Sequence, residues 1–152
     1  MSCRSMNVYQ TKVRPGEITG VFTASFECVD VFCRQVRDLL PAGFSKSARF
    51  EITLLLREAL NNAIVHGSKR SLEQSVCCTV TVQKPWVTIT VQDQGEGFEW
   101  NERLHRQGST ADCQHPMTGI DIMKSMADEV QYNTKGNTIS LRKKILSLEE
   151  GQ

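Results

Sequence analysis

A carboxylate and a carboxamide occur one helical turn apart in the stretch Arg57–Gly67, which reads REALNNAIVHG. Glu58, Asn62 and His66 are spaced four residues apart, so a helix places them in one row. Mg²⁺ takes few oxygen ligands from a protein and the rest from water and phosphates, and an Asn side-chain oxygen suits that role. A nearby Glu suits the activation of an attacking hydroxyl. The alternative is the ordinary solvent border of an amphipathic helix.

A second candidate group follows a run of β-forming residues, where the sequence reads DQGEGF. Asp93 at the end of a strand can accept a hydrogen bond from the amino group of adenine. Gly95 and Gly97 allow the backbone to approach a ligand closely or to move. An ordinary Asp/Gly turn after a strand is the alternative interpretation.

A third feature is Gly119, which begins a predicted helix after a polar stretch. Helix N-termini bind phosphate through backbone N–H groups and a favourable dipole. Entry into a helix through a glycine is also common without any ligand. Two other phosphate motifs, GxxxxGK[ST] and GxGxxG, are absent from the sequence, which excludes a P-loop, a Rossmann fingerprint and a eukaryotic-type kinase loop.

These residues are positioned by a predicted alternation of helices with hairpins. The predicted strands are 18–24, 75–83, 86–92, 130–133 and 138–145, and the predicted helices are 25–40, 45–66 and 119–127. This order predicts an α+β fold, a two-layer α/β sandwich with a mixed, mostly antiparallel sheet and helices on one face. We expect a leader over 1–16, one domain over 17–146, a mobile polar segment over 99–118 within it, and a tail over 147–152.

Composition limits the possible partners of the chain. Its 152 residues carry 18 Lys+Arg against 17 Asp+Glu, a formal net charge of +1. This balance gives no basic footprint for nucleic acid or an anionic membrane, so we expect neither partner. No apolar run approaches the roughly 18 residues that span a bilayer. The six cysteines form no CxxC motif and no apolar signal sequence begins the chain, which favours buried thiols in a reducing cytoplasm.

In order and spacing, the three motifs resemble the GHKL ATPase family. The stretch REALNNAIVHG, the strand that leads into DQGEGF, a polar lid, the stretch TGIDIMKSMADEV and a final hairpin that ends in GNTISLRKKI follow that family's N box, first glycine box, lid and second glycine box. The resemblance covers about residues 17–146. Within the family, the sequence is most similar to the bacterial serine kinases that double as anti-sigma factors.

This resemblance implies a role for each candidate residue. Glu58 matches the catalytic base, and Asn62 matches the residue that coordinates Mg²⁺. Asp93 matches the residue that binds adenine, and Gly95 and Gly97 belong to the same box. In the second glycine box, Gly119 matches the second glycine of the pair. The resemblance therefore implies ATP and Mg²⁺ as cofactors.

The second glycine box departs from the family pattern, because Met117, preceded by Pro116, replaces its first glycine. A bulkier and stiffer hinge bears on lid closure and turnover. Arg103 and Arg106 are both candidates for a contact with the γ-phosphate, and the sequence does not choose between them.

The resemblance also implies partners: a sigma factor, a STAS-domain anti-sigma-factor antagonist with a serine as phosphoacceptor, and a second copy of the chain in a homodimer. The first functional hypothesis is a protein-serine kinase that also binds a sigma factor. The alternative, motivated by Met117, is a nucleotide-binding or degenerate module that acts by partner binding only. A third is a kinase of a scaffold STAS protein that has no sigma partner.

Overall fold

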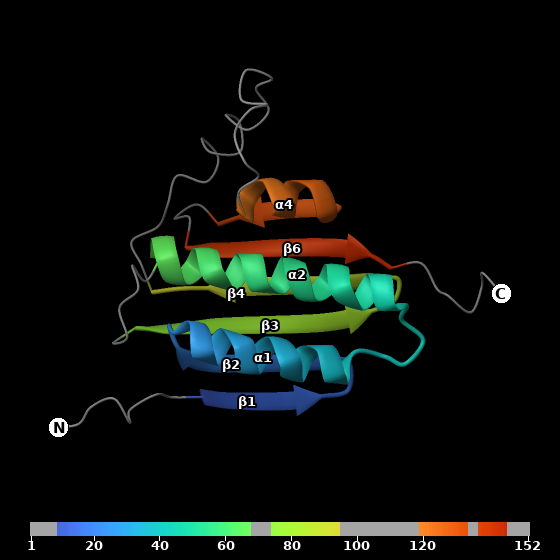
Figure 1. Cartoon of the computed structure of the whole chain (residues 1–152), viewed down its shortest axis with the longest axis horizontal. Helices are drawn as coiled ribbons and strands as arrows, with labels where there is room; N and C mark the ends of the chain where they lie inside the picture. Colours follow the sequence, from blue (N-terminus) through green and yellow to red (C-terminus); the bar gives the residue numbers. More distant parts are fainter. Residues whose placement is uncertain (1–8, 68–73, 95–118, 134–136, 146–152) are drawn as a thin grey trace, which may run out of the picture.

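A computed structural model describes residues 9–67, 74–94, 119–133 and 137–145 of the chain (Figure 1). Within these ranges, three α-helices and one π-helical turn accompany six strands. The strands are β1 (Tyr9–Arg14), β2 (Glu17–Thr23), β3 (Ser75–Gln83), β4 (Trp86–Gln92), β5 (Glu129–Tyr132) and β6 (Thr138–Lys144). The helical elements are α1 (Phe26–Leu39), α2 (Lys46–Asn62), the π-helical turn η2 (Ala63–Gly67) and α4 (Gly119–Met126).

The strands form one sheet in the order β1-β2-β3-β4-β6-β5. Figure 1 shows α1, α2 and α4 on the same face of this sheet. The predicted α+β fold with two layers and helices on one face is confirmed. All the pairings between these described strands are antiparallel, so the sheet has less mixed character than we expected.

Serine side chains cap the first two helices. Ser25 accepts a hydrogen bond from the backbone N–H of Cys28 (3.2 Å), and Ser45 accepts one from that of Ala48 (2.9 Å). Each cap satisfies one of the backbone donors that a helix start leaves without a partner. The predicted apolar stripe of the second helix is confirmed, because all its members are buried: Ile52, Leu55, Leu56 and Ala59 of α2, and Ala63 at the start of η2.

The two faces of the sheet differ in the manner that the alternation predicts. On β4, Val87, Ile89 and Val91 are buried beneath the helices. Thr88 and Thr90 lie between them on the opposite face and are only half-buried. The apolar core therefore lies between the sheet and the helix layer, and the opposite face of the central strands carries hydroxyl side chains.

A glycine allows α1 to pack closely on β2. A Cβ atom at Gly20 would lie 2.5 Å from Cε1 of Phe32, a distance at which one of the two would have to move. The Phe32 ring is fully buried, and its centroid lies 5.3 Å from that of Phe22. The absence of a side chain at Gly20 thus provides room for the aromatic centre of the core.

Part of the expected leader is structured, which corrects our prediction for residues 9–14. They form β1, an edge strand that pairs with β2 through a turn at Pro15-Gly16, where Gly16 has a positive φ of 76°. Tyr9 stacks on Phe22 and its hydroxyl donates to Oε1 of Gln35 (2.6 Å). An edge strand has a neighbouring strand on one side only. Its residues are therefore mostly polar and exposed, and their pattern did not predict a strand.

Several predictions fall outside the described residues. These are the mobile segment 99–118, including the departure at Met117 and the two lid arginines, and the tail 147–152. Among the helices that the structure describes, none combines the length and the apolarity needed to cross a membrane.

Candidate functional site

The end of α2 presents a carboxamide at one end of the sheet. Asn62 is the last α-helical residue, and η2 continues the chain from Ala63 to Gly67. A π-helical turn is rare and often occurs at functional sites, because it changes the direction of neighbouring side chains relative to an α-helix. The predicted helix to His66 is confirmed in extent, with a change of helix type after Asn62.

Asp93 continues the row of buried side chains that β4 directs toward the helices. Ile89 and Val91 face the helices, and Asp93, two residues further on, lies on the same face with only 7% of its surface exposed. A carboxylate in an apolar row costs free energy to desolvate unless polar contacts compensate it. The backbone N–H of Asp93 donates to the carbonyl of Asn137 (3.0 Å), which continues the pairing of β4 with β6.

The structure brings Asn62 and Asp93 together. Both side chains line a small pocket between the end of α2, the end of β4 and the start of β6, and the other lining residues are Ala59, Ala63, Val91, Asn137, Thr138 and Ile139. The pocket has a volume of about 10 Å³, roughly the space of one water molecule. It therefore marks a point that both predicted residues border, and a larger ligand would have to extend beyond it.

One end of the Asn62 carboxamide lacks a hydrogen bond. Its Nδ2 is buried and has no partner among the described residues. A buried amide without a partner costs about 1–3 kcal/mol, so such a group in a folded protein requires an explanation. A ligand or a bound water that completes the contact would provide one.

The residues present fit a magnesium ion that takes one ligand from the protein and most of its ligands from phosphates and water. The two ends of an Asn amide exchange by a 180° rotation, so Asn62 can direct its oxygen to the position of the unpartnered nitrogen. Across the described residues, no group of three or more His, Cys, Asp or Glu side chains could hold a metal by itself. A single amide oxygen, completed by phosphates and water, is consistent with the way proteins bind Mg²⁺.

Glu58 lies one turn before Asn62 on α2 and is half-buried, but it does not line the pocket. Its neighbour Arg57 forms an ion pair with Asp30 of α1. The hydrogen bond to Asp30 is the main cause that raises the pKa of Arg57, and the charge of Glu58 adds to it. This ion pair connects α1 to the part of α2 that carries the candidate base.

Of the three predicted glycines, the structure describes only Gly119. Gly95 and Gly97 lie outside the described residues, in the segment that follows Gln94. The side-chain Oε1 of Gln94 accepts a hydrogen bond from the backbone N–H of Ser75 (2.9 Å), which ties the end of β4 to the start of β3. Gly119 is the first residue of α4, as predicted.

Sequence reasoning missed Asn137 and Thr138, which line the pocket with the predicted pair. Asn133 organises them, because its Oδ1 accepts from the backbone N–H groups of both residues (3.0 and 3.1 Å). Its Nδ2 also donates to Oδ1 of Asn137 (2.8 Å). The available signal was the pair of asparagines four residues apart at the ends of a predicted hairpin turn.

Comparison with known proteins identifies a matching domain family and several similar proteins. Residues 22–143 match the histidine kinase-like ATPase domain. The anti-sigma F factor of Bacillus subtilis (strain 168) is 31% identical over 98 residues, which cover 61% of this chain and 67% of that protein. The anti-sigma F factors of Anoxybacillus flavithermus (strain DSM 21510 / WK1) and Bacillus thuringiensis (strain Al Hakam) are 31% and 32% identical, with the same coverage.

Proposed function

The chain belongs to the histidine kinase-like ATPase family, and on this basis we propose that it is an ATP-dependent protein-serine kinase that also acts as an anti-sigma factor. Its proposed substrate is a serine of a STAS-domain anti-sigma-factor antagonist, and its other partner is a sigma factor. We place this activity in the cytoplasm, where sigma factors act, and in a homodimer.

The observation that carries the proposal is the meeting of Asn62 and Asp93 at one pocket. The two residues come from different elements that are far apart in the sequence, so a helix border or a strand turn alone does not account for their convergence. The buried, unpartnered Nδ2 end of the Asn62 amide adds a group that a ligand can satisfy.

In the proposed complex, the Asp93 carboxylate accepts a hydrogen bond from the amino group of adenine. The oxygen of Asn62 holds Mg²⁺, which supplies positive charge to the phosphates when it is bound. Gly95, Gly97 and Gly119 provide backbone that can approach the nucleotide without a side chain between them. These roles follow the family resemblance of each residue.

Glu58 is the proposed base of the transfer. Its carboxylate accepts the proton of the serine hydroxyl as the serine oxygen forms a bond to the γ-phosphorus. The bond between that phosphorus and the β,γ-bridging oxygen breaks, and ADP leaves. The products are phosphoserine on the antagonist and ADP.

A phosphorylation assay with purified antagonist candidates tests this function. Replacement Glu58→Ala should lower the single-turnover rate by about 10²-fold or more, because general bases contribute effects of this size. Nucleotide affinity should remain, since Glu58 does not line the pocket. The matched control is Glu27→Ala, which removes an exposed carboxylate from the first turn of α1. Full activity of Glu58→Ala would remove it from the role of base.

A second function is favoured by Met117, which replaces a glycine of the second glycine box. In this alternative the chain binds nucleotide weakly or not at all and regulates its partner by binding only. Robust phosphorylation of a STAS protein by the wild-type chain would exclude it. A sigma factor that co-purifies with the chain would count against a kinase that serves only a scaffold protein.

A further inference from the structure

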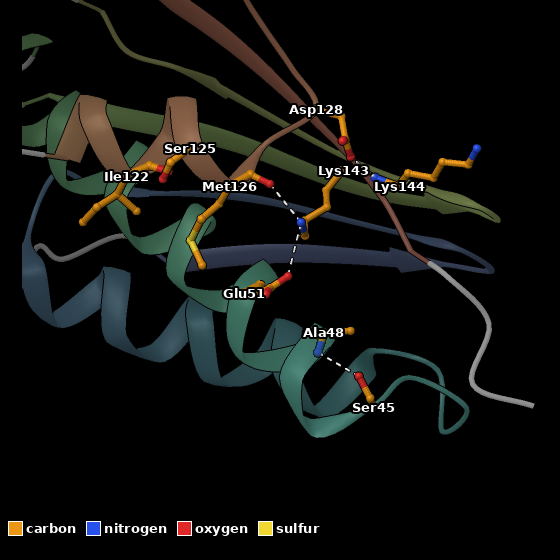
Figure 2. Close-up of polar contacts among 9 residues, drawn as sticks. All are labelled: Ser45, Ala48, Glu51, Ile122, Ser125, Met126, Asp128, Lys143 and Lys144. Atoms are coloured by element: carbon orange, nitrogen blue, oxygen red, sulfur yellow. Dashed lines mark hydrogen bonds and ion pairs between the residues drawn. The ribbon is translucent and has the colours of Figure 1, made fainter. Parts of the chain in front are cut away.

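A lysine from β6 contacts the C-terminal end of α4. The Nζ atom of Lys143 donates to the backbone carbonyl of Met126 (2.9 Å) and forms an ion pair with Oε1 of Glu51 (3.2 Å), as Figure 2 shows. The lysine side chain is 18% exposed and the glutamate side chain 34%. One ammonium group therefore joins three elements, α2, α4 and β6, at a partly buried position.

Main-chain contacts hold the residues that follow α4 against the same strand. The backbone N–H of Asp128 donates to the carbonyl of Arg142 (2.8 Å). The backbone N–H of Lys144 donates to Oδ2 of Asp128 (2.6 Å; Figure 2). The connection from α4 to β5 is thus attached to Arg142 and Lys144 of β6, on either side of Lys143, which contacts the end of α4.

The Lys143 contact is well suited to fix a short helix. The last carbonyl groups of a helix lack intrahelical partners, and a cation near them also interacts favourably with the helix dipole. The eight residues of α4 are too few to form a stable helix in isolation, so its tertiary contacts determine its position. The buried side chain of Met123 provides one such contact, and Lys143 provides another.

The same contact is connected to the candidate site through α2. Glu51 lies near the start of this helix, and Asn62 is its last residue. Figure 1 shows α4 antiparallel to α2, so the start of α4 lies at the same end of the sheet as the end of α2. A shift of α4 along its axis would therefore move its start relative to Asn62.

We propose that Lys143 is a positioning residue of the nucleotide site, because it holds the end of α4 to α2 and β6 and so sets the place of the start of that helix. The inference rests on the proposed function. Lys143 itself touches no nucleotide in this account, and its effect passes through α4.

Hydrogen exchange of the nucleotide-free chain tests whether Lys143 holds α4 in place. In Lys143→Met, amides of α4 should exchange about tenfold faster, as expected when one charge-assisted hydrogen bond is lost. Amides of β3 and β4 should keep their wild-type rates, which shows that the variant is folded. The matched control is Lys144→Met, which removes the same charge from the next residue, whose side chain is exposed.

Calorimetry with Mg-ADP tests whether the position of α4 affects nucleotide binding. Affinity should fall about tenfold in Lys143→Met and remain unchanged in Lys144→Met. Lys143→Arg should restore both affinity and exchange rates, because a guanidinium can donate to Met126 and pair with Glu51. This rescue also keeps the inference testable if Lys143→Met folds poorly.

Either of two results would overturn the inference: wild-type exchange of α4 in Lys143→Met, or faster exchange with wild-type Mg-ADP affinity. The second result would leave Lys143 with a structural role only. Failure of the proposed function would look different, because the wild-type chain itself would then bind no nucleotide.

Discussion

The helices α1 and α2 pack beside each other on the same face of the sheet. They differ in how completely their buried polar side-chain atoms are hydrogen-bonded. The inner side of α1 is apolar, and Phe32 is fully buried against β2. The last turn of α2 instead carries Asn61 and Asn62, each with a buried polar atom that lacks a partner among the described residues. The comparison indicates that α1 contributes mainly stability, whereas the end of α2 carries unpartnered polar atoms, as expected of a site that trades some stability for the proposed function.

The largest expected effect on stability is in α1. Replacement Phe32→Ala should lower the free energy of unfolding by about 3–5 kcal/mol, because it removes a fully buried ring and leaves a cavity. Urea denaturation measures this change. Val31→Ala is the control on the same helix, since Val31 is 41% exposed. A loss for Phe32→Ala as small as that of the control would contradict the assignment of α1 to the core.

A smaller effect is expected from the buried thiol of α1. Burial raises the pKa of Cys33 from its ordinary 9.0 to about 11, with a lesser opposing effect from Arg57. The folded chain therefore keeps a proton that the unfolded chain releases, so stability is retained below pH 9 and falls as the pH rises toward 11. This thiol contributes a slope of about 1.4 kcal/mol per pH unit within that window.

The difference between wild type and Cys33→Ala isolates this contribution. Other groups with raised pKa values, including Cys78 and Tyr132, remain in both chains. The wild-type free energy of unfolding should fall more steeply between pH 9 and 11 than that of the variant. Parallel curves for the two chains would show that Cys33 is not sealed from solvent.

The smallest effect on stability is expected at the end of α2. Replacement Asn62→Ala should leave the free energy of unfolding within about 1 kcal/mol of wild type, because it removes a buried, unpartnered amide nitrogen and introduces a better helix former. The same variant should lose the Mg²⁺ dependence of nucleotide binding. Urea denaturation and calorimetry with and without Mg²⁺ measure both properties. A large loss of stability would show that Asn62 serves the core.

Local patterns predicted the elements that have a strong period or clear end signals. The stripe of α2, the hairpin of β3 and β4, and Gly119 at the start of α4 all follow from neighbouring residues. Strand β1 was missed because an edge strand has little apolar alternation. The asparagine pair at the turn before β6 gave a local signal for Asn137, but its place beside Asp93 and the Lys143 contact depend on which distant strands become neighbours, and no short pattern records that.

The residues of the candidate site were also predicted with unequal success. The resemblance singled out Asn62 and Asp93, and the structure places both at one pocket. The resemblance also singled out Glu58, but its role depends on a bound substrate and stays a prediction. Gly95 and Gly97 lie outside the described residues, so their role also stays a prediction.

The most direct test of the central claim is a calorimetric titration of Mg-ATP and Mg-ADP into the wild-type chain and into Asp93→Asn. We predict binding that requires Mg²⁺ and that weakens at least tenfold in the variant, because one neutral amide oxygen is a weaker acceptor for the adenine amino group than the buried carboxylate. Absence of binding at millimolar nucleotide, or equal binding by both chains, would contradict the assignment of this end of the sheet as a nucleotide site.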